Sequence, residues 1–504
     1  MPLTPAQAGA LRDRLAPELT KRAKRVSLLE DYRDGDHPLP EGLTSGLGSR
    51  KARAARDLHR RLLKVSRSNW CGLVVDAVDE RLAVIGFRFD GQDAADEELW
   101  RIYQANGLDA EGLLVQGNAL ASGQAMVSVW PGRTAQEDPI IRAEHPSEVI
   151  VAYGRGRRDR IAALKSYVDE EGFGQAVLYT KEEVWKWQTA KKVTGFSLQF
   201  HGDAAGRWVP KVVPGEQWPM ASPTPGVVPI VEFQANPRLK PSRYGGGLAE
   251  FEGVLDIQDR INETVFGRLV STHYHAFPQK WVTGMDIPTD DSGTPIEPFQ
   301  SAIDRLLAVE EPDAKFGTFP EATLTGYLSG VEADVKHLAA ISKTPPHYLL
   351  GEMVNISADA LKAAEIGLVS KVRRHQLYMG EAWEEVGRLA MLCKGDQKKG
   401  TDPMLEVIWR DPESRSDAQV IDGLVKLGSA PISLPRSEIW ARVPGATPRM
   451  IAGWEAELVA EDLNAPAPPP PPASIAGDLP GAAPGSSVAK PAPAPAAPMP
   501  AHAH

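Results

Sequence analysis

Cysteine is almost absent from this chain, because Cys71 and Cys393 are the two cysteines among 504 residues and neither belongs to a CxxC pair. This scarcity argues against a disulfide framework or a zinc cluster and fits a reducing cytosol. No apolar run of about 18 residues is present, so we expect no transmembrane helix and no membrane partner. The N-terminal stretch MPLTPAQAGALRDRL has no apolar signal core, so we expect no secretion.

Several catalytic signatures are also missing. The chain contains no GxxxxGK[ST] loop, no GxSxG elbow and no HExxH helix, so nothing in it indicates an ATPase, a serine hydrolase or a zinc protease, and we expect no cofactor. An excess of positive charge is lacking too, since the formal net charge is -10. Such a chain is a poor candidate for gripping nucleic acid over its whole surface, although nucleic acid can still slide past it.

Periodicity predicts an α+β chain of several structural units. Residues 5–31 repeat leucines at helical spacing, and residues 139–235 alternate as short antiparallel strands with glycine turns. Further helices are expected from Leu248 to about Ser271, from about Glu321 to Ser342, and from Ser357 to about Lys394. Residues 416–462 are expected to be helical with proline breaks. The arginine-rich segment 50–67 is either a solvated helix face or the hint of a basic groove.

The stretch TPPHYLLGEMVNISADALKAAE, residues 344–365, separates two of these helices. Its two prolines disfavour a continuous helix, Gly351 offers a pivot, and Ser357 with Asp359 nearby suits a helix N-cap. The tip between them, from Leu349 to Val354, is apolar and carries no catalytic group. It is either an ordinary helix connection with a hydrophobic contact or a loop with a mechanical role.

A metal-dependent hydrolase or nuclease is the alternative from a different class. His273 and His275 would share one face if they lay on a strand, and Asp290 with Asp291 could bind Mg²⁺. The competing interpretation puts the histidines at a helix end or a subunit contact and the aspartates, like Glu310 and Glu311, at loop tips. No third ligand lies near the histidines in sequence, so we expect no metal site.

Seven stretches in order carry a resemblance to a known family. The chain resembles the portal proteins of tailed double-stranded-DNA bacteriophages, in the group similar to the portal of siphophage SPP1 and common in actinobacterial phages. The resemblance runs from about residue 20 to 460 and leaves the Pro/Ala-rich tail outside it. The stretches are DYRDGDHPLP (31–40), NWCGLVVDAVDERLAVIGFR (69–88), GNALASGQAMVSVWP (117–131), EHPSEVIVAY (144–153), KTPPHYLLG (343–351), ALKAAEIGLVSKVRRHQ (360–376) and VIWRDPESRS (407–416).

The resemblance implies a portal fold assembled as a ring, with a mixed α/β wing, a two-helix stem, a small α/β clip and a helical crown. Residues are assigned to these parts by their order in the chain. The parts are a wing (1–245), stem helix 1 (246–275), a clip (276–321), stem helix 2 (322–343), a tunnel loop (344–357), the long wing helix and a strand (358–415), a crown (416–462) and a disordered tail (463–504).

The resemblance also implies a function without enzymatic activity. Such rings, typically dodecamers, pass double-stranded DNA at one capsid vertex. Their partners are the terminase large subunit, a head-completion or adaptor protein, and the major capsid and scaffold proteins. The protein would belong to the virion, and to the host cytoplasm during assembly.

Two sets of residues are candidates for the DNA channel. An acidic channel wall would keep DNA mobile, because each phosphate that a cation neutralises adds salt-dependent affinity. The candidate stem acids are Glu252, Asp256, Asp259 and Glu263, within a helix that also holds Glu250, Arg260 and Arg268. The residues of the tunnel loop are His347, Tyr348, Leu349, Leu350, Gly351, Met353 and Val354.

Overall fold

The computed structural model contains α-helices and antiparallel sheets, as expected for an α+β chain. It divides into two compact units, Met1–Gly453 and Trp454–His504. The residues that it describes are 2–38, 53–92, 95–134, 137–156, 159–193, 207–239, 246–275, 280–284, 313, 315–318, 324–351, 358–413, 417–430, 432–440, 442–443 and 446–464. The predicted disordered tail, apart from its first two residues, lies outside this part.

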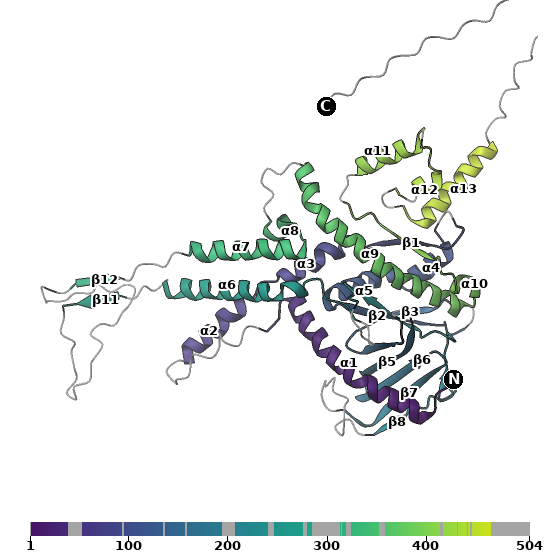
Figure 1. The fold of residues 1–504 in the computed structure, drawn as a ribbon, viewed down its shortest axis with the longest axis horizontal. Helices are drawn as coiled ribbons and strands as arrows, with labels where there is room; N and C mark the ends of the chain where they lie inside the picture. Colours follow the sequence, from purple (N-terminus) through teal and green to yellow (C-terminus); the bar gives the residue numbers. More distant parts are fainter. Residues whose placement is uncertain are drawn as a thin grey trace, which may run out of the picture. The chain divides into compact units, whose positions relative to one another are not determined.

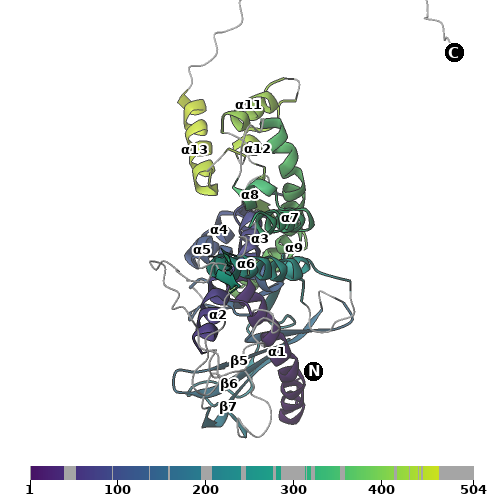
Figure 2. The ribbon, with the colours of Figure 1, turned by 90° about the vertical axis from the view of Figure 1, so that its left-hand side faces the viewer.

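A six-stranded antiparallel sheet forms one layer of the first unit, with the order β4-β5-β6-β7-β8 and β9 paired to β7. Helix α1 (Pro5–Asp34) packs on β4, β5 and β6. Figures 1 and 2 show it beside the labelled strands β5 and β6. Its Leu15 and Leu19 pack with Ile150 and Trp185 of the sheet. The strands are β4 (Val149–Tyr153), β5 (Arg160–Val168), β6 (Phe173–Thr180), β7 (Glu183–Lys192), β8 (Trp208–Pro210) and β9 (Met220–Ala221).

A three-stranded sheet forms the next layer, with the order β10-β2-β3. Because side chains alternate along a strand, each of its faces has its own core. Met126 of β2 packs with Val149 and Val151 of the larger sheet, whereas Val127 faces the main hydrophobic core. The strands are β2 (Gln124–Trp130), β3 (Ile140–Glu144) and β10 (Ile230–Gln234).

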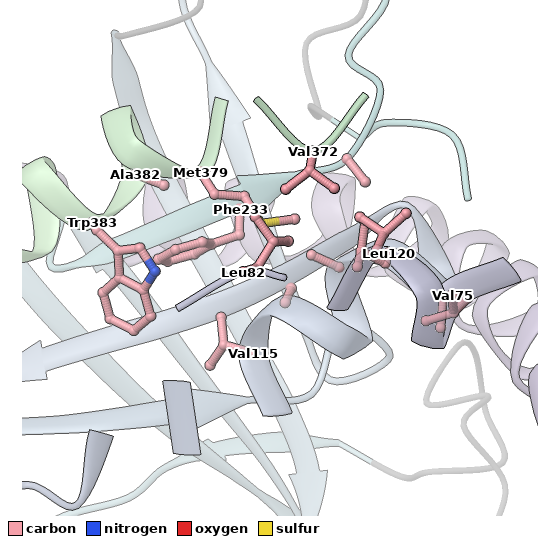
Figure 3. Close-up of a cluster of buried hydrophobic side chains, with 14 of the residues drawn as sticks. Val75, Leu82, Val115, Leu120, Phe233, Val372, Met379, Ala382 and Trp383 are labelled. Carbon is pink, nitrogen blue, oxygen red and sulfur yellow. The ribbon is translucent and has the colours of Figure 1, made fainter. Parts of the chain in front are cut away.

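The main core lies between this second sheet and a group of helices. Trp383 is fully buried and contacts Phe233 and Tyr103, with ring centroids 4.8 and 5.5 Å apart. Figure 3 shows the Trp383 indole beside Phe233, with Leu82 and Val115 nearby. The helices are α3 (Trp70–Asp79), α4 (Glu97–Ala105), α5 (Leu108–Ser122) and the long α9 (Ala358–Lys394), and a two-stranded sheet joins β1 (Val84–Arg88) to β13 (Glu406–Trp409).

A helical hairpin follows β10 in the sequence. Helix α6 (Leu255–His275) packs antiparallel on α7 (Thr325–Ser342), and α2 (Arg53–Val65) packs on α6 (Figure 1). Between α6 and α7 in the sequence, the described residues form the small antiparallel pair β11 (Lys280–Thr283) and β12 (Lys315–Thr318).

The predicted start of the first stem helix at Leu248 is wrong. A 3-10 turn (η3, Glu252–Val254) precedes α6, and the backbone before it is held by other segments. Leu248 N–H donates to the Ala235 carbonyl over 3.1 Å, and a Cβ on Gly247 would lie 1.7 Å from that same oxygen. Only glycine permits so close an approach, so the helix starts later.

Among the described residues four further helices follow α9, and the last three lie in the region after residue 416 that the sequence predicted to be helical. They are α10 (Gln397–Gly400), α11 (Asp417–Gly428), α12 (Arg436–Trp440) and α13 (Pro448–Asn464). The described part of the second unit is residues 454–464, which belong to α13.

Candidate functional site

The first half of the predicted tunnel loop is a packed helix. Helix α8 (Pro346–Leu350) begins at a proline in its first turn and ends at Gly351, whose φ of 67° is left-handed. Leu349 is only 5% exposed and belongs to the main core, and Tyr348 and Leu350 pack against that core. The prediction of an apolar loop tip from Leu349 to Val354 is therefore wrong at Leu349, whose burial fits the alternative of a helix connection with a hydrophobic contact. Met353 and Val354, and the predicted N-cap Ser357, lie outside the described residues.

Arg81 joins three segments around α8. Its Nη2 donates to Tyr348 Oη over 2.8 Å and to Glu365 Oε1 of α9 over 3.2 Å, while Nη1 donates to the Pro412 carbonyl over 2.8 Å. The side chains of Arg81 and Glu365 are 9% and 11% exposed, so this ion pair is shielded from water. We call these four residues the Arg81 cluster.

A second buried cluster joins the helical hairpin to α9. Glu250, just before η3, lies 3.0 Å from Lys371 Nζ and accepts from His375 Nε2 and Asn236 Nδ2, each over 2.8 Å. Lys371 also donates to the carbonyl of Ser342, the last residue of α7, over 2.7 Å. Burial alone would raise the pKa of Glu250, but the hydrogen bond from His375 and the charge of Lys371 outweigh it and lower the pKa to about 2. We call these residues the Glu250 cluster.

Two of the four predicted stem acids have partners within the chain. Glu252 forms an ion pair with Arg25 at 2.6 Å and accepts from the Ala249 N–H. Both carboxylate oxygens of Asp259 lie 3.0 Å from Tyr32 Oη, which donates to them. Burial raises the pKa of Asp259.

The other two predicted acids, Asp256 and Glu263, are exposed on α6. Arg260 lies between them, but its charge is taken up by Asp334 of α7 at 2.6 Å. The exposed face formed by Asp256, Arg260 and Glu263 is therefore negative overall, and we call it the acidic face.

The geometry of α6 argues against the predicted alternative of a histidine metal pair. His273 and His275 lie on the last turn of a helix rather than on a strand. Residues two apart on a helix lie about 200° apart around its axis, and not on one face as they would on a strand. Within the described part of the chain, no group of three histidine, cysteine, aspartate or glutamate residues could hold a metal ion. Asp290 and Asp291, like Glu310 and Glu311, lie outside that part.

Sequence reasoning missed the residues at the centre of both clusters. Arg81, Lys371 and His375 lie in stretches that the resemblance used, but no local spacing marks them as partners of residues 121 or more positions away. Across the described residues, no helix is long and apolar enough to cross a membrane.

Comparison with known proteins gives consistent results. The sequence model of the family described as phage portal protein, SPP1 Gp6-like, matches residues 12–462. The portal protein of Mycobacterium phage L5 is 31% identical over 386 residues, covering 72% of this chain and 73% of the relative. The portal protein of Mycobacterium phage D29 is 30% identical with the same coverage.

Two solved structures are similar at low identity. A chain in the virion of a native gene transfer agent particle has a TM-score of 0.40 and 13% identity, covering 79% of this chain and 95% of that one. A chain in the neck of an empty particle of that agent has a TM-score of 0.41 and 12% identity, with coverage of 78% and 93%.

Proposed function

The chain belongs to the SPP1 Gp6-like family of phage portal proteins, and from that premise we propose that its copies form a ring through which double-stranded DNA enters and leaves the phage head. As a member, it is a structural head-to-tail connector protein. The observation that carries the proposal is the family match over residues 12–462 together with two portal relatives at about 30% identity.

The ring itself is tested by the mass and the image of the purified chain. A closed ring needs one surface that fits a different surface on the next copy, so we expect a cyclic assembly of about twelve copies, a dodecamer. Single-particle mass measurement and negative-stain imaging should find rings with a central hole wide enough for duplex DNA. A monomer or dimer at micromolar concentration, also in the presence of scaffold protein, would contradict the proposal.

We assign the parts of the ring as the order of the chain suggests. Residues 1–245 and 358–415 form the wing, α6 and α7 the stem, 276–321 the clip and 416–462 the crown. The clip, whose described residues form the β11 and β12 pair, is the expected contact for the terminase large subunit and later for the adaptor protein. Replacing residues 280–318 by a short glycine-serine linker should abolish terminase capture and leave the number of subunits in the ring unchanged.

The acidic face of α6 supports a channel that does not grip DNA. Like charges repel the phosphate backbone, whereas cations there would bind it with strong salt dependence. We propose that Asp256 and Glu263 face the channel, and that residues 351–357 approach the DNA. Replacing Met353 and Val354 by serine should reduce DNA retention in heads. The matched change at Leu350, which packs against the core, should instead impair folding.

Remaining partners follow from the same proposal. Assembly in the host cytoplasm would require contacts with the major capsid and scaffold proteins at the wing.

A nuclease assay of the pure protein with Mg²⁺ or Mn²⁺ tests the alternative function. Cleavage that disappears when His273 is replaced would favour the nuclease.

A further inference from the structure

The three partners of Arg81 are far apart in sequence and close to one another in the fold. Tyr348, Glu365 and Pro412 lie 267, 284 and 331 positions from Arg81. Tyr348 belongs to α8, which precedes residues 352–357, and Glu365 belongs to the part of α9 that follows them. Pro412 lies between β13 and α11. One side chain thus contacts both flanks of this connection and the segment that leads to α11.

The chemistry of the contacts requires arginine. A guanidinium presents its donors as a rigid planar fork, and here one nitrogen serves Tyr348 and Glu365 while the other serves the Pro412 carbonyl. The ammonium group of lysine is a single point and cannot reach all three acceptors from the same position. Without Arg81, the shielded carboxylate of Glu365 would lack its cation, and its free energy would fall if it moved towards water.

We propose that Arg81 is a positioning residue, which fixes α8 against the start of α9 and ties both to the segment entering α11. The inference rests on the proposed function, because these flanks carry the residues that approach the DNA. Leu349 supplies the apolar anchor of α8, and Arg81 supplies its orientation. A shift of the segment before α11 is thereby coupled to the flanks of residues 352–357.

Hydrogen exchange on the assembled full-length chain tests whether Arg81 holds α8 against the start of α9. In Arg81→Met, the α8 amides of Tyr348 and Gly351, which donate to the carbonyls of Pro345 and His347, should exchange at least about tenfold faster. The amides at 363–368 and the amide of Arg410, which donates to the Ala83 carbonyl over 2.9 Å, should also exchange faster. The control is Arg160→Met. Arg160 is equally buried at 9% exposure and pairs with Glu385 of the same helix α9, far from α8. This control should leave exchange in α8 unchanged.

Two conservative variants separate orientation from general stability. Arg81→Lys should restore slow exchange near Glu365 but not at the Arg410 amide, because its ammonium cannot also reach the Pro412 carbonyl. Tyr348→Phe, which removes one hydroxyl and keeps the ring, should speed exchange in α8 alone, and it remains informative if Arg81→Met does not fold. A purely structural arginine would produce neither regional pattern.

Two results would overturn the inference. One is unchanged exchange in α8 for both Arg81→Met and Tyr348→Phe, and the other is equal acceleration in Arg160→Met. DNA retention in assembled heads tests the premise separately. We expect retention to fall with Arg81→Met while the ring mass stays the same. Faster α8 exchange with normal retention would contradict the role of these flanks beside DNA, and hence that part of the proposed function.

Discussion

Glu250 and Glu263 belong to the same short stretch of chain and lie in opposite surroundings. Glu250 is 5% exposed and is held by Lys371, His375 and Asn236, whereas Glu263 is exposed on the acidic face of α6. Glu250 ties the segment before α6 to Lys371 and His375 of α9, so its charge stabilises the fold. Glu263 is exposed to solvent, so its charge can act on a ligand.

The largest loss of stability is expected when the buried Glu250 is replaced by a neutral residue. Glu250→Gln leaves the ammonium of Lys371 buried without its anion, which costs about 3–5 kcal/mol of unfolding free energy. Urea denaturation should therefore show a much lower midpoint. Glu263→Gln is the control and should change stability by less than about 0.5 kcal/mol. Equal losses in the two variants would remove the contrast.

Lowering the pH should also reduce the stability of the fold, because it protonates Glu250. The pKa of Glu250 is lowered from 4.5 to about 2 in the folded chain, so the folded state binds the proton less readily than the unfolded state. Its contribution, about 3 kcal/mol, is complete above pH 4.5 and is lost as the pH falls towards 2. Denaturation at several pH values should show that Glu250→Gln lacks this component. A wild-type and variant difference that stays constant from pH 5 to 2.5 would be inconsistent with the cluster.

A smaller loss of stability is expected at Asp259, whose exposure lies between those of Glu250 and Glu263. Tyr32→Phe removes the hydroxyl that donates to Asp259, at a cost of about 1–2 kcal/mol. Thermal denaturation measures it, and Asp256→Asn, which changes an exposed acid on the same helix, is the matched control. If Asp256→Asn costs as much as Tyr32→Phe, Asp256 has a structural partner in the assembly that we propose.

The smallest effect on stability should coincide with a clear effect on function. Replacing Asp256 and Glu263 together by lysine should leave the denaturation midpoint nearly unchanged, because both are exposed. DNA passage should become slower and strongly salt-dependent, since each new cation can neutralise a phosphate. Packaging assays at several salt concentrations measure this effect. Asp259→Asn provides the control within the same helix, and packaging by the lysine variant that matches wild type would show that this face lies away from DNA.

The sequence predicts much of this fold because most elements are long and periodic. Helix α1, the antiparallel strands between 139 and 235, and α9 follow from alternation or helical spacing alone. The prediction failed where a tertiary contact overrides the local pattern. The apolar pattern predicts that a helix starts at Leu248, yet the N–H of Leu248 donates to the Ala235 carbonyl. Leu349 reads as a loop tip, yet Gly351 ends a short helix that buries it.

The candidate site was less predictable than the fold for a related reason. Acids could be assigned to the first stem helix, but their burial depends on partners such as Tyr32 and Lys371 that lie far away in sequence. Spacing within one helix shows which residues share a face and does not show what covers that face. The resemblance to a family supplied the function, while the roles of Arg81 and Glu250 required the structure.

The pairing of β1 with β13 has a consequence for synthesis of the chain. Arg88 and Glu406 are partners in this sheet and lie 318 residues apart. A ribosome adds about 5–20 residues each second, so β1 waits for roughly 15–60 seconds before its partner strand emerges. During that interval its edge is open to strands of other nascent chains. Dense polysomes, in which neighbouring copies are made side by side, are therefore the setting in which this protein is most exposed to aggregation.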